Sequence, residues 1–149
     1  GNAVINILNK YPNWNSVVIG DEPREKIKFN HKRFNILGFQ NNKIVTKWFK
    51  KAQISITCSR IEEPFGRTAL EASSAGCAVI ITNRGGLPEA SPNAIKLNKL
   101  TIKNLQNKIE RLIKNQNLKR TLQKKIYKHF FLTNDYISKK IDSYRNQFV

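Results

Sequence analysis

Apolar residues recur in two alternating patterns over the first hundred positions. Short runs rich in β-branched residues predict strands at residues 14–20, 34–39, 54–59, 78–82 and 94–97. Apolar residues three or four positions apart predict helices over residues 2–11, 42–52 and 66–75. Strands that alternate with helices through short connections indicate a parallel sheet with right-handed crossovers.

The pattern changes after Leu100, where only helical spacing remains. Three apolar stripes follow, formed by Ile102, Leu105, Ile109 and Leu112, by Leu118, Leu122, Ile126 and Phe130, and by Ile137, Ile141 and Tyr144. We therefore expect one domain over residues 1–149, with an α/β part at 1–100 and a helical tail at 101–149. A chain of 149 residues is long enough to bury a hydrophobic core.

Basic residues outnumber acidic ones by 27 to 10, which gives a net charge of +17. The excess is concentrated in the tail, because residues 96–149 carry 14 Lys and Arg against 3 Asp and Glu. This charge suits an anionic membrane surface or nucleic acid. Ordinary solvated faces, enriched in lysine by the codon bias of an AT-rich genome, explain it slightly more simply, and the choice stays open. Nucleic acid is disfavoured because aromatic residues are not interleaved with the basic ones.

Cysteine and histidine positions give no sign of a metal site. Cys58 and Cys77 lack a metal-binding or redox spacing, so we expect two buried, reduced thiols. His31 and His129 are isolated in charged segments, without an Asp-x-Asp motif or a His/Cys cluster. We therefore predict neither a metal nor another cofactor.

Candidate chemistry gathers where the third predicted strand meets a helix, in the stretch SITCSRIEEPFGRTALEA. Ligands of parallel sheets bind at the carboxyl ends of strands, where helices begin. Pro64 suits a helix start, and Gly66 lets backbone approach a ligand closely. The free amides from Gly66 to Thr68, together with the helix dipole, form an anion site suited to phosphate.

Two glutamates flank this helix start. Glu71 follows Thr68 by three positions and Arg67 by four, so the three side chains share one helix face. Glu71 is placed to accept hydrogen bonds from sugar hydroxyls, and Glu63 can reach the other side of the phosphate. The pair would bracket a phosphate-linked sugar, as in a nucleotide-sugar. Spacing alone leaves a second option open, in which Glu71 pairs with Arg67 on the surface.

The segment from residue 63 to 89 resembles the Glu-x7-Glu signature of retaining glycosyltransferases of family 4, which have the GT-B fold. The matching positions are Glu63, Pro64, Phe65, Gly66, Glu71, Ala72, Gly76, Val79, Ile80, Gly85, Gly86, Pro88 and Glu89. The resemblance implies a Rossmann-like, three-layer α/β domain with a parallel sheet, the C-terminal and donor-binding half of a GT-B fold. The helices that follow would cross back toward an N-terminal domain.

The resemblance also implies roles for individual residues. Glu63, the catalytic candidate, would contact hydroxyls of the donor sugar, and the amides of Phe65 and Gly66 would bind the same sugar. Thr68 would bind the distal phosphate. Glu71 would hold the ribose hydroxyls.

The flanking glycines would surround the nucleotide. By resemblance, Gly38 and Phe39 would lie near the base, and Gly20 near the edge of the nucleotide. Gly85 and Gly86 would form a tight turn beside the site.

The chain departs from the family pattern in two respects. Arg67 stands where an apolar residue is frequent, and it either contacts the phosphate or pairs with a glutamate. The family's first strand, the Arg and Lys of the loop after it, and the N-terminal acceptor domain are absent. Because much of the charge that stabilises the leaving diphosphate is missing, we expect this chain alone to bind nucleotide weakly and to be inactive.

The sequence therefore predicts the donor domain of a cytoplasmic hexosyltransferase in polysaccharide biosynthesis. Its partners would be a nucleoside diphosphate sugar and, through the absent domain, a glycan or lipid-linked acceptor. Peripheral contact with the inner membrane face through the basic helices remains an option. The alternatives are a non-catalytic nucleotide-binding module, a nucleotide-sugar epimerase and a basic nucleic-acid-binding domain.

Overall fold

A computed structural model describes residues 1–20 and 29–147. Its elements are, in chain order, α1 (Asn2–Lys10), β1 (Ser16–Val18), β2 (Phe34–Ile36), α2 (Asn42–Lys51), β3 (Ile54–Thr57), α3 (Arg67–Ser74), β4 (Ala78–Thr82), α4 (Leu87–Ala90), β5 (Ile95–Leu97), α5 (Ile102–Lys114), α6 (Gln116–Lys128) and α7 (Asn134–Arg145). Each predicted strand and helix is present, with shorter ends. The apolar pattern does not predict α4, because a single turn is too short for a periodic signal. The charged loop predicted at residues 21–32 lies mostly outside the described residues.

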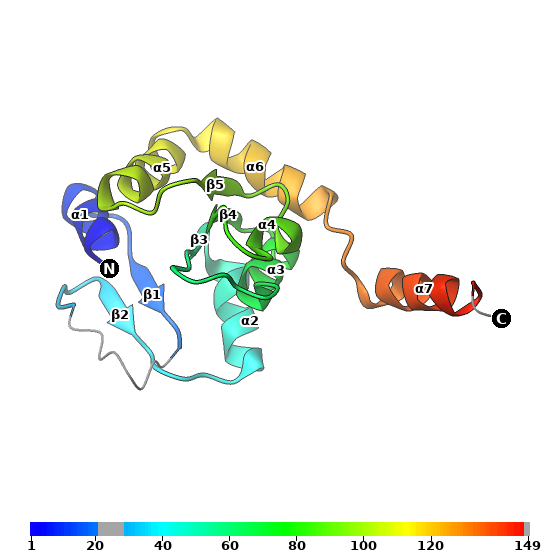
Figure 1. The fold of residues 1–149 in the computed structure, drawn as a ribbon. Coiled ribbons are helices and arrows are strands. Elements are labelled where there is room, and N and C mark those ends of the chain that lie inside the picture. Colours follow the sequence, from blue (N-terminus) through cyan, green and yellow to red (C-terminus); the bar gives the residue numbers. More distant parts are fainter. Residues whose placement is uncertain (21–28, 148–149) are drawn as a thin grey trace.

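The strands form two parallel sheets rather than one (Figure 1). Strand β1 pairs with β2, and the second sheet has the order β3–β4–β5. All five residues of β4 are buried, which agrees with a strand covered on both faces. The predicted parallel α/β architecture is therefore confirmed, and the division of the sheet is the feature that the sequence pattern did not predict.

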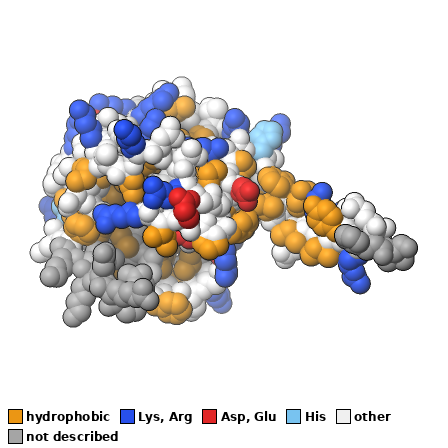
Figure 2. Space-filling view, in the orientation of Figure 1, with side chains coloured by type: hydrophobic (Ala, Val, Ile, Leu, Met, Phe, Trp, Pro, Cys, Tyr) orange, Lys and Arg blue, Asp and Glu red, His pale blue; other side chains and the backbone are white. Residues whose placement is uncertain are grey.

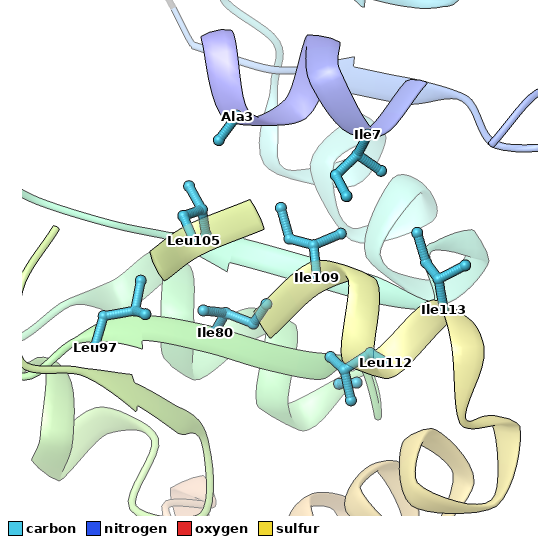
Figure 3. Close-up of a cluster of buried hydrophobic side chains, with 9 residues drawn as sticks. Ala3, Ile7, Ile80, Leu97, Leu105, Ile109, Leu112 and Ile113 are labelled. Atoms are coloured by element: carbon cyan, nitrogen blue, oxygen red, sulfur yellow. The ribbon is translucent and has the colours of Figure 1, made fainter. Parts of the chain in front are cut away.

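Helices cover both faces of the second sheet and produce three layers. On one face Ile80 and Leu97 pack against residues of α1 and α5, including Ala3, Ile7 and Ile109 (Figure 3). On the other face Val79 and Ile81 pack against buried residues of α3, α4 and α6, namely Ala69, Ala72, Leu87 and Ile126. Because neighbouring residues of a strand point to opposite faces, β4 supplies side chains to both clusters.

The helical tail does not behave as one unit. Helices α5 and α6 contribute buried residues to the two core clusters. Helix α7 has no buried residue, and it extends away from the rest of the chain (Figure 1). Its predicted apolar stripe is exposed, with Ile141 and Tyr144 each at 51%. None of the helices in the described part of the chain is both long and apolar enough to cross a bilayer.

Lys119 departs from the expectation that the basic residues lie on solvated faces. Its side chain is buried in α6, where the ammonium lies 4.9 Å from the centre of the Trp14 ring and donates to the Gln53 side-chain oxygen. Burial lowers the pKa of Lys119. The contact joins the tail to the segment before β1 and to the start of β3.

A polar cluster joins α1 to α5. The Glu110 carboxylate accepts hydrogen bonds from Lys10 at 2.6 Å and from the Tyr11 hydroxyl at 2.7 Å, and Lys114 lies 2.8 Å away. These hydrogen bonds, that from Lys10 first, lower the pKa of Glu110 to about 2. The folded chain therefore favours the ionised form of this carboxyl group.

Glu110→Gln should weaken the dependence of folding stability on acid pH. Because the folded pKa of Glu110 lies below its ordinary value of 4.5, its contribution is present above that value and is lost as the pH falls toward about 2. Urea unfolding between about pH 5 and pH 2 should show a smaller loss of stability in the variant than in the wild type. Asp135→Asn, at an exposed carboxylate of α7, is the control. Equal losses in wild type and Glu110→Gln would contradict the assignment.

Candidate nucleotide-binding site

Two loops meet at the carboxyl ends of β3 and β4. The amide of Ser59 donates to Thr82 Oγ1 at 3.1 Å, and the amide of Gly86 donates to the carbonyl oxygen of Glu63 at 2.7 Å. The amide of Gly85 donates to the Glu62 carboxylate at 2.5 Å. The loop that carries Glu63 is therefore fixed by the turn at Gly85 and Gly86.

The approach of these loops requires glycine. A Cβ at Gly85 would lie 2.6 Å from the Glu63 nitrogen, and a Cβ at Gly86 would lie 2.5 Å from the carbonyl oxygen of Pro64. Gly85 also has a φ of +53°, which disfavours other residues. The glycine pair thus sets the distance between the two loops, whatever ligand the site binds.

Helix α3 begins without a side-chain cap. Gly66 precedes it in the left-handed conformation, and a Cβ there would lie 2.6 Å from Leu87. Hydrogen bonding within the helix starts with Ala69, whose amide donates to the Gly66 oxygen at 3.0 Å. The amides of Arg67 and Thr68, in the first turn, are left for partners outside the helix. Together with the positive end of the helix dipole they suit an anion.

Glu71 lies one turn further along α3. Its carboxylate is 3.9 Å from the Arg67 guanidinium and 3.5 Å from the side-chain nitrogen of Asn42, at the start of α2. The Arg67 side chain is 83% exposed, and pairs of this kind contribute little to stability. The surface pairing left open by the sequence is therefore present, but it holds Glu71 only loosely.

The glycines predicted near the nucleotide lie at the ends of the other sheet. The amide of Gly20, after β1, donates to the carbonyl oxygen of Gly38, after β2, at 2.9 Å. Phe39 is 81% exposed. Asn42 follows Phe39 by three residues and reaches Glu71, so it links this pair of strand ends to the first turns of α3.

The structure also shows polar residues that sequence reasoning missed. The Arg84 guanidinium lies 3.5 Å from the Glu62 carboxylate and donates to the carbonyl oxygen of Arg60. A polar hollow of about 320 Å³ opens beside them, lined by Ser59, Arg60, Thr82, Asn83, Arg84, Leu97, Asn98 and Leu100. Acidic and basic side chains lie next to each other on the face drawn in Figure 2. Glu62 and Arg84 come from different loops, so no periodic pattern in the sequence connects them.

Thiols and metal ligands do not add to the site. Cys77 is buried, Cys58 is partly buried, and both are free, as predicted. Burial raises the pKa of each thiol to about 11, which keeps both protonated at neutral pH. In the described part of the chain, no group of three His, Cys, Asp or Glu side chains is placed to hold a metal ion.

The fold and this edge define a Rossmann-like α/β domain with an anion site at the carboxyl ends of its strands. The chain belongs to the family described as glycosyl transferases group 1, whose model matches residues 3–129. Its fold matches the C-terminal domain of a group 1 glycosyl transferase, LpcC of Francisella tularensis. The TM-score is 0.73 with 28% identity, over 85% of this chain and 73% of that one.

Two further relatives come from other organisms. One subunit of the phosphatidylinositol N-acetylglucosaminyltransferase of Homo sapiens is 31% identical over 116 residues, or 72% of this chain and 24% of that protein. The structure of Anabaena HepE in complex with UDP and glucose has a TM-score of 0.75 at 18% identity, over 95% of this chain and 44% of that one. The chain thus spans about a quarter of the length of its human relative.

Gly85→Ala should be more damaging than Gly38→Ala. Both glycines have positive φ, but a Cβ at Gly38 meets nothing within 4 Å, whereas one at Gly85 meets the backbone of Glu63. The backbone penalty in Gly38→Ala should cost about 1 kcal/mol of unfolding free energy. Steric strain should make Gly85→Ala worse by a further ~1–3 kcal/mol, measured by urea unfolding. Equal losses would mean that the two loops separate without cost.

Proposed function

We propose that this chain is the donor-binding domain of a retaining glycosyltransferase of family 4, which binds a nucleoside diphosphate sugar. One observation carries the proposal. The uncapped start of α3 and the loop of Glu63 are held together at the carboxyl edge by backbone hydrogen bonds from Gly85 and Gly86. Ligands of open parallel sheets bind at this edge, and helix starts of this kind bind phosphate.

In this proposal the diphosphate binds at the first turn of α3. The amides of Arg67 and Thr68 and the Thr68 hydroxyl donate to phosphate oxygens. Glu71 accepts hydrogen bonds from the ribose hydroxyls, and the exposure of Arg67 leaves its guanidinium free to turn toward phosphate. Gly20, Gly38 and Phe39 contact the nucleoside.

Glu63, with the amides of Phe65 and Gly66, orients the donor sugar. When the bond between the anomeric carbon and the diphosphate breaks, negative charge grows on the diphosphate. Fixed amides at the helix start stabilise that charge without reorganising. Glu63 is the catalytic candidate because its backbone is fixed at Gly86 while its side chain is only partly buried.

The rest of the enzyme would supply the acceptor and the remaining charge for the leaving group. The names of the relatives indicate which ligands to test first. HepE was crystallised with UDP-glucose, and the human relative is named as an N-acetylglucosaminyltransferase acting on phosphatidylinositol. We propose a UDP-hexose or UDP-N-acetylhexosamine as donor and a glycan or lipid-linked acceptor bound by another domain. The chain alone would bind the donor weakly and would not transfer it. Its place would be the cytoplasm, with the basic helices near the inner membrane face.

Glu71→Ala should weaken binding of the nucleoside diphosphate. Loss of charged hydrogen bonds to ribose should cost about 1–3 kcal/mol, or roughly 5- to 150-fold in Kd. Calorimetric titration with UDP, GDP and ADP, and then with their sugars, measures the effect and identifies the base. Asp142→Ala on α7 removes the same charge from an exposed position far along the chain and should leave Kd unchanged.

Other outcomes of this titration would favour other functions. An unchanged Kd in Glu71→Ala would remove that residue from the site. Binding that ignores both glutamates and declines steeply with salt would favour a nucleic-acid partner. Nucleotide binding by the whole protein without transfer to any acceptor would favour a non-catalytic module.

Nucleotide binding should not require a divalent metal. The proposed phosphate ligands are backbone amides and a hydroxyl, so replacing MgCl₂ with EDTA at constant ionic strength should leave Kd for UDP within about twofold. A loss of affinity above tenfold in EDTA would contradict the metal-free site.

A further inference from the structure

The two parallel sheets each have an edge without a strand partner. In β1, Ser16 and Gly20 donate their amides to Arg33 and Gly38 on the side of β2. Backbone groups of a parallel strand alternate between its two sides, so those of Val17 and Ile19 point away from β2.

The open edge of β3 follows from the same alternation. The amide of Ala78 donates to the carbonyl oxygen of Gln53, on the side of β4. The backbone groups of Ile54 and Ile56 therefore point away from β4. Open edges of buried parallel strands are unusual, because their amides and carbonyls need partners.

The direction of α1 indicates that the two edges face the same missing element. Helices α1 and α5 run side by side in one direction, since Asn6 contacts Gln106 and Lys10 contacts Glu110 with the same separation of 100 residues. Helix α5 follows strand β5, whereas no strand of the described chain precedes α1 (Figure 1).

Handedness then fixes the position of that strand. Helix α3 connects β3 to β4 across one face, and α1 leads into β1 across the opposite face. Crossovers between parallel strands are almost always right-handed. A strand leading into α1 must therefore lie on the side of β1 away from β2, which is the side of β3.

Local features beside β3 agree with this position. The Gly1 amine lies near Cys58 and Arg60, just beyond the end of β3, and burial followed by the Arg60 charge lowers its pKa. Ile56 is 36% exposed although it belongs to a sheet covered by helices on both faces. Thr57 Oγ1 is buried without a hydrogen-bond partner among the described residues.

We propose that β1 and β3 form the two walls of a slot that accepts one extended, predominantly apolar strand. The strand would run parallel to both walls and join the sheets in the order β2–β1–strand–β3–β4–β5. Its occupant is a segment leading through a short turn into Gly1. That turn would lie at the carboxyl edge, near Arg60, so the slot couples completion of the sheet to the edge where Glu63 lies. This inference rests on the fold and does not depend on the donor.

The test adds a strand to the complete 149-residue chain. One version carries the N-terminal extension Lys-Val-Ile-Val-Ile-Gly-Asn before Gly1. The matched version has proline at the second and fourth positions, which cannot donate in a central strand. Amide hydrogen exchange is followed by NMR in both versions and in the unextended chain.

The apolar extension should slow exchange at Val17, Ile19, Ile54 and Ile56 by at least about tenfold, while the proline version leaves them as fast as in the unextended chain. Ser16 and Ser55, whose backbone groups face strands already present, serve as internal controls and should change less. The proposal is overturned if the four amides exchange slowly in the unextended chain, or if the two extensions act alike.

Discussion

The contact between the β3–α3 and β4–α4 loops determines the shape of the candidate site. Gly85 and Gly86 donate to Glu62 and Glu63, and neither position has room for a side chain. The contact fixes the Glu63 backbone immediately before the start of α3. Without it, the uncapped helix start would be an anion site with no defined neighbour for the sugar that a diphosphate carries. The glycine pair therefore acts through geometry, and the glutamates through chemistry.

Strand positions were predictable because their apolar runs are short and dense. The run at residues 78–82 matches β4 at both ends, and the two clusters follow from its alternating side chains. The division of the sheet was not predictable from periodicity, which reports the type of an element and not its partner. Lys119 was missed for the same reason, since its burial depends on Trp14 and Gln53, far away in sequence.

The candidate site was predictable where residues act within one segment. The uncapped start of α3 and the shared face of Arg67 and Glu71 follow from local spacing. The partners Asn42, Glu62 and Arg84 were not predicted, because their contacts join loops and helices that the sequence does not connect. Membership of the glycosyl transferases group 1 family agrees with the fold. The roles of individual side chains remain proposals.

The most direct test of the central claim is NMR mapping of the amides at the start of α3. On titration with UDP, the account predicts that the amide resonances of Arg67 and Thr68 shift strongly as they bind phosphate. Leu118, whose amide in the first turn of α6 is already capped by Asn115, should not shift. Saturating nucleotide that leaves Arg67 and Thr68 unchanged, or shifts them no more than Leu118, would contradict the claim that this helix start binds the diphosphate.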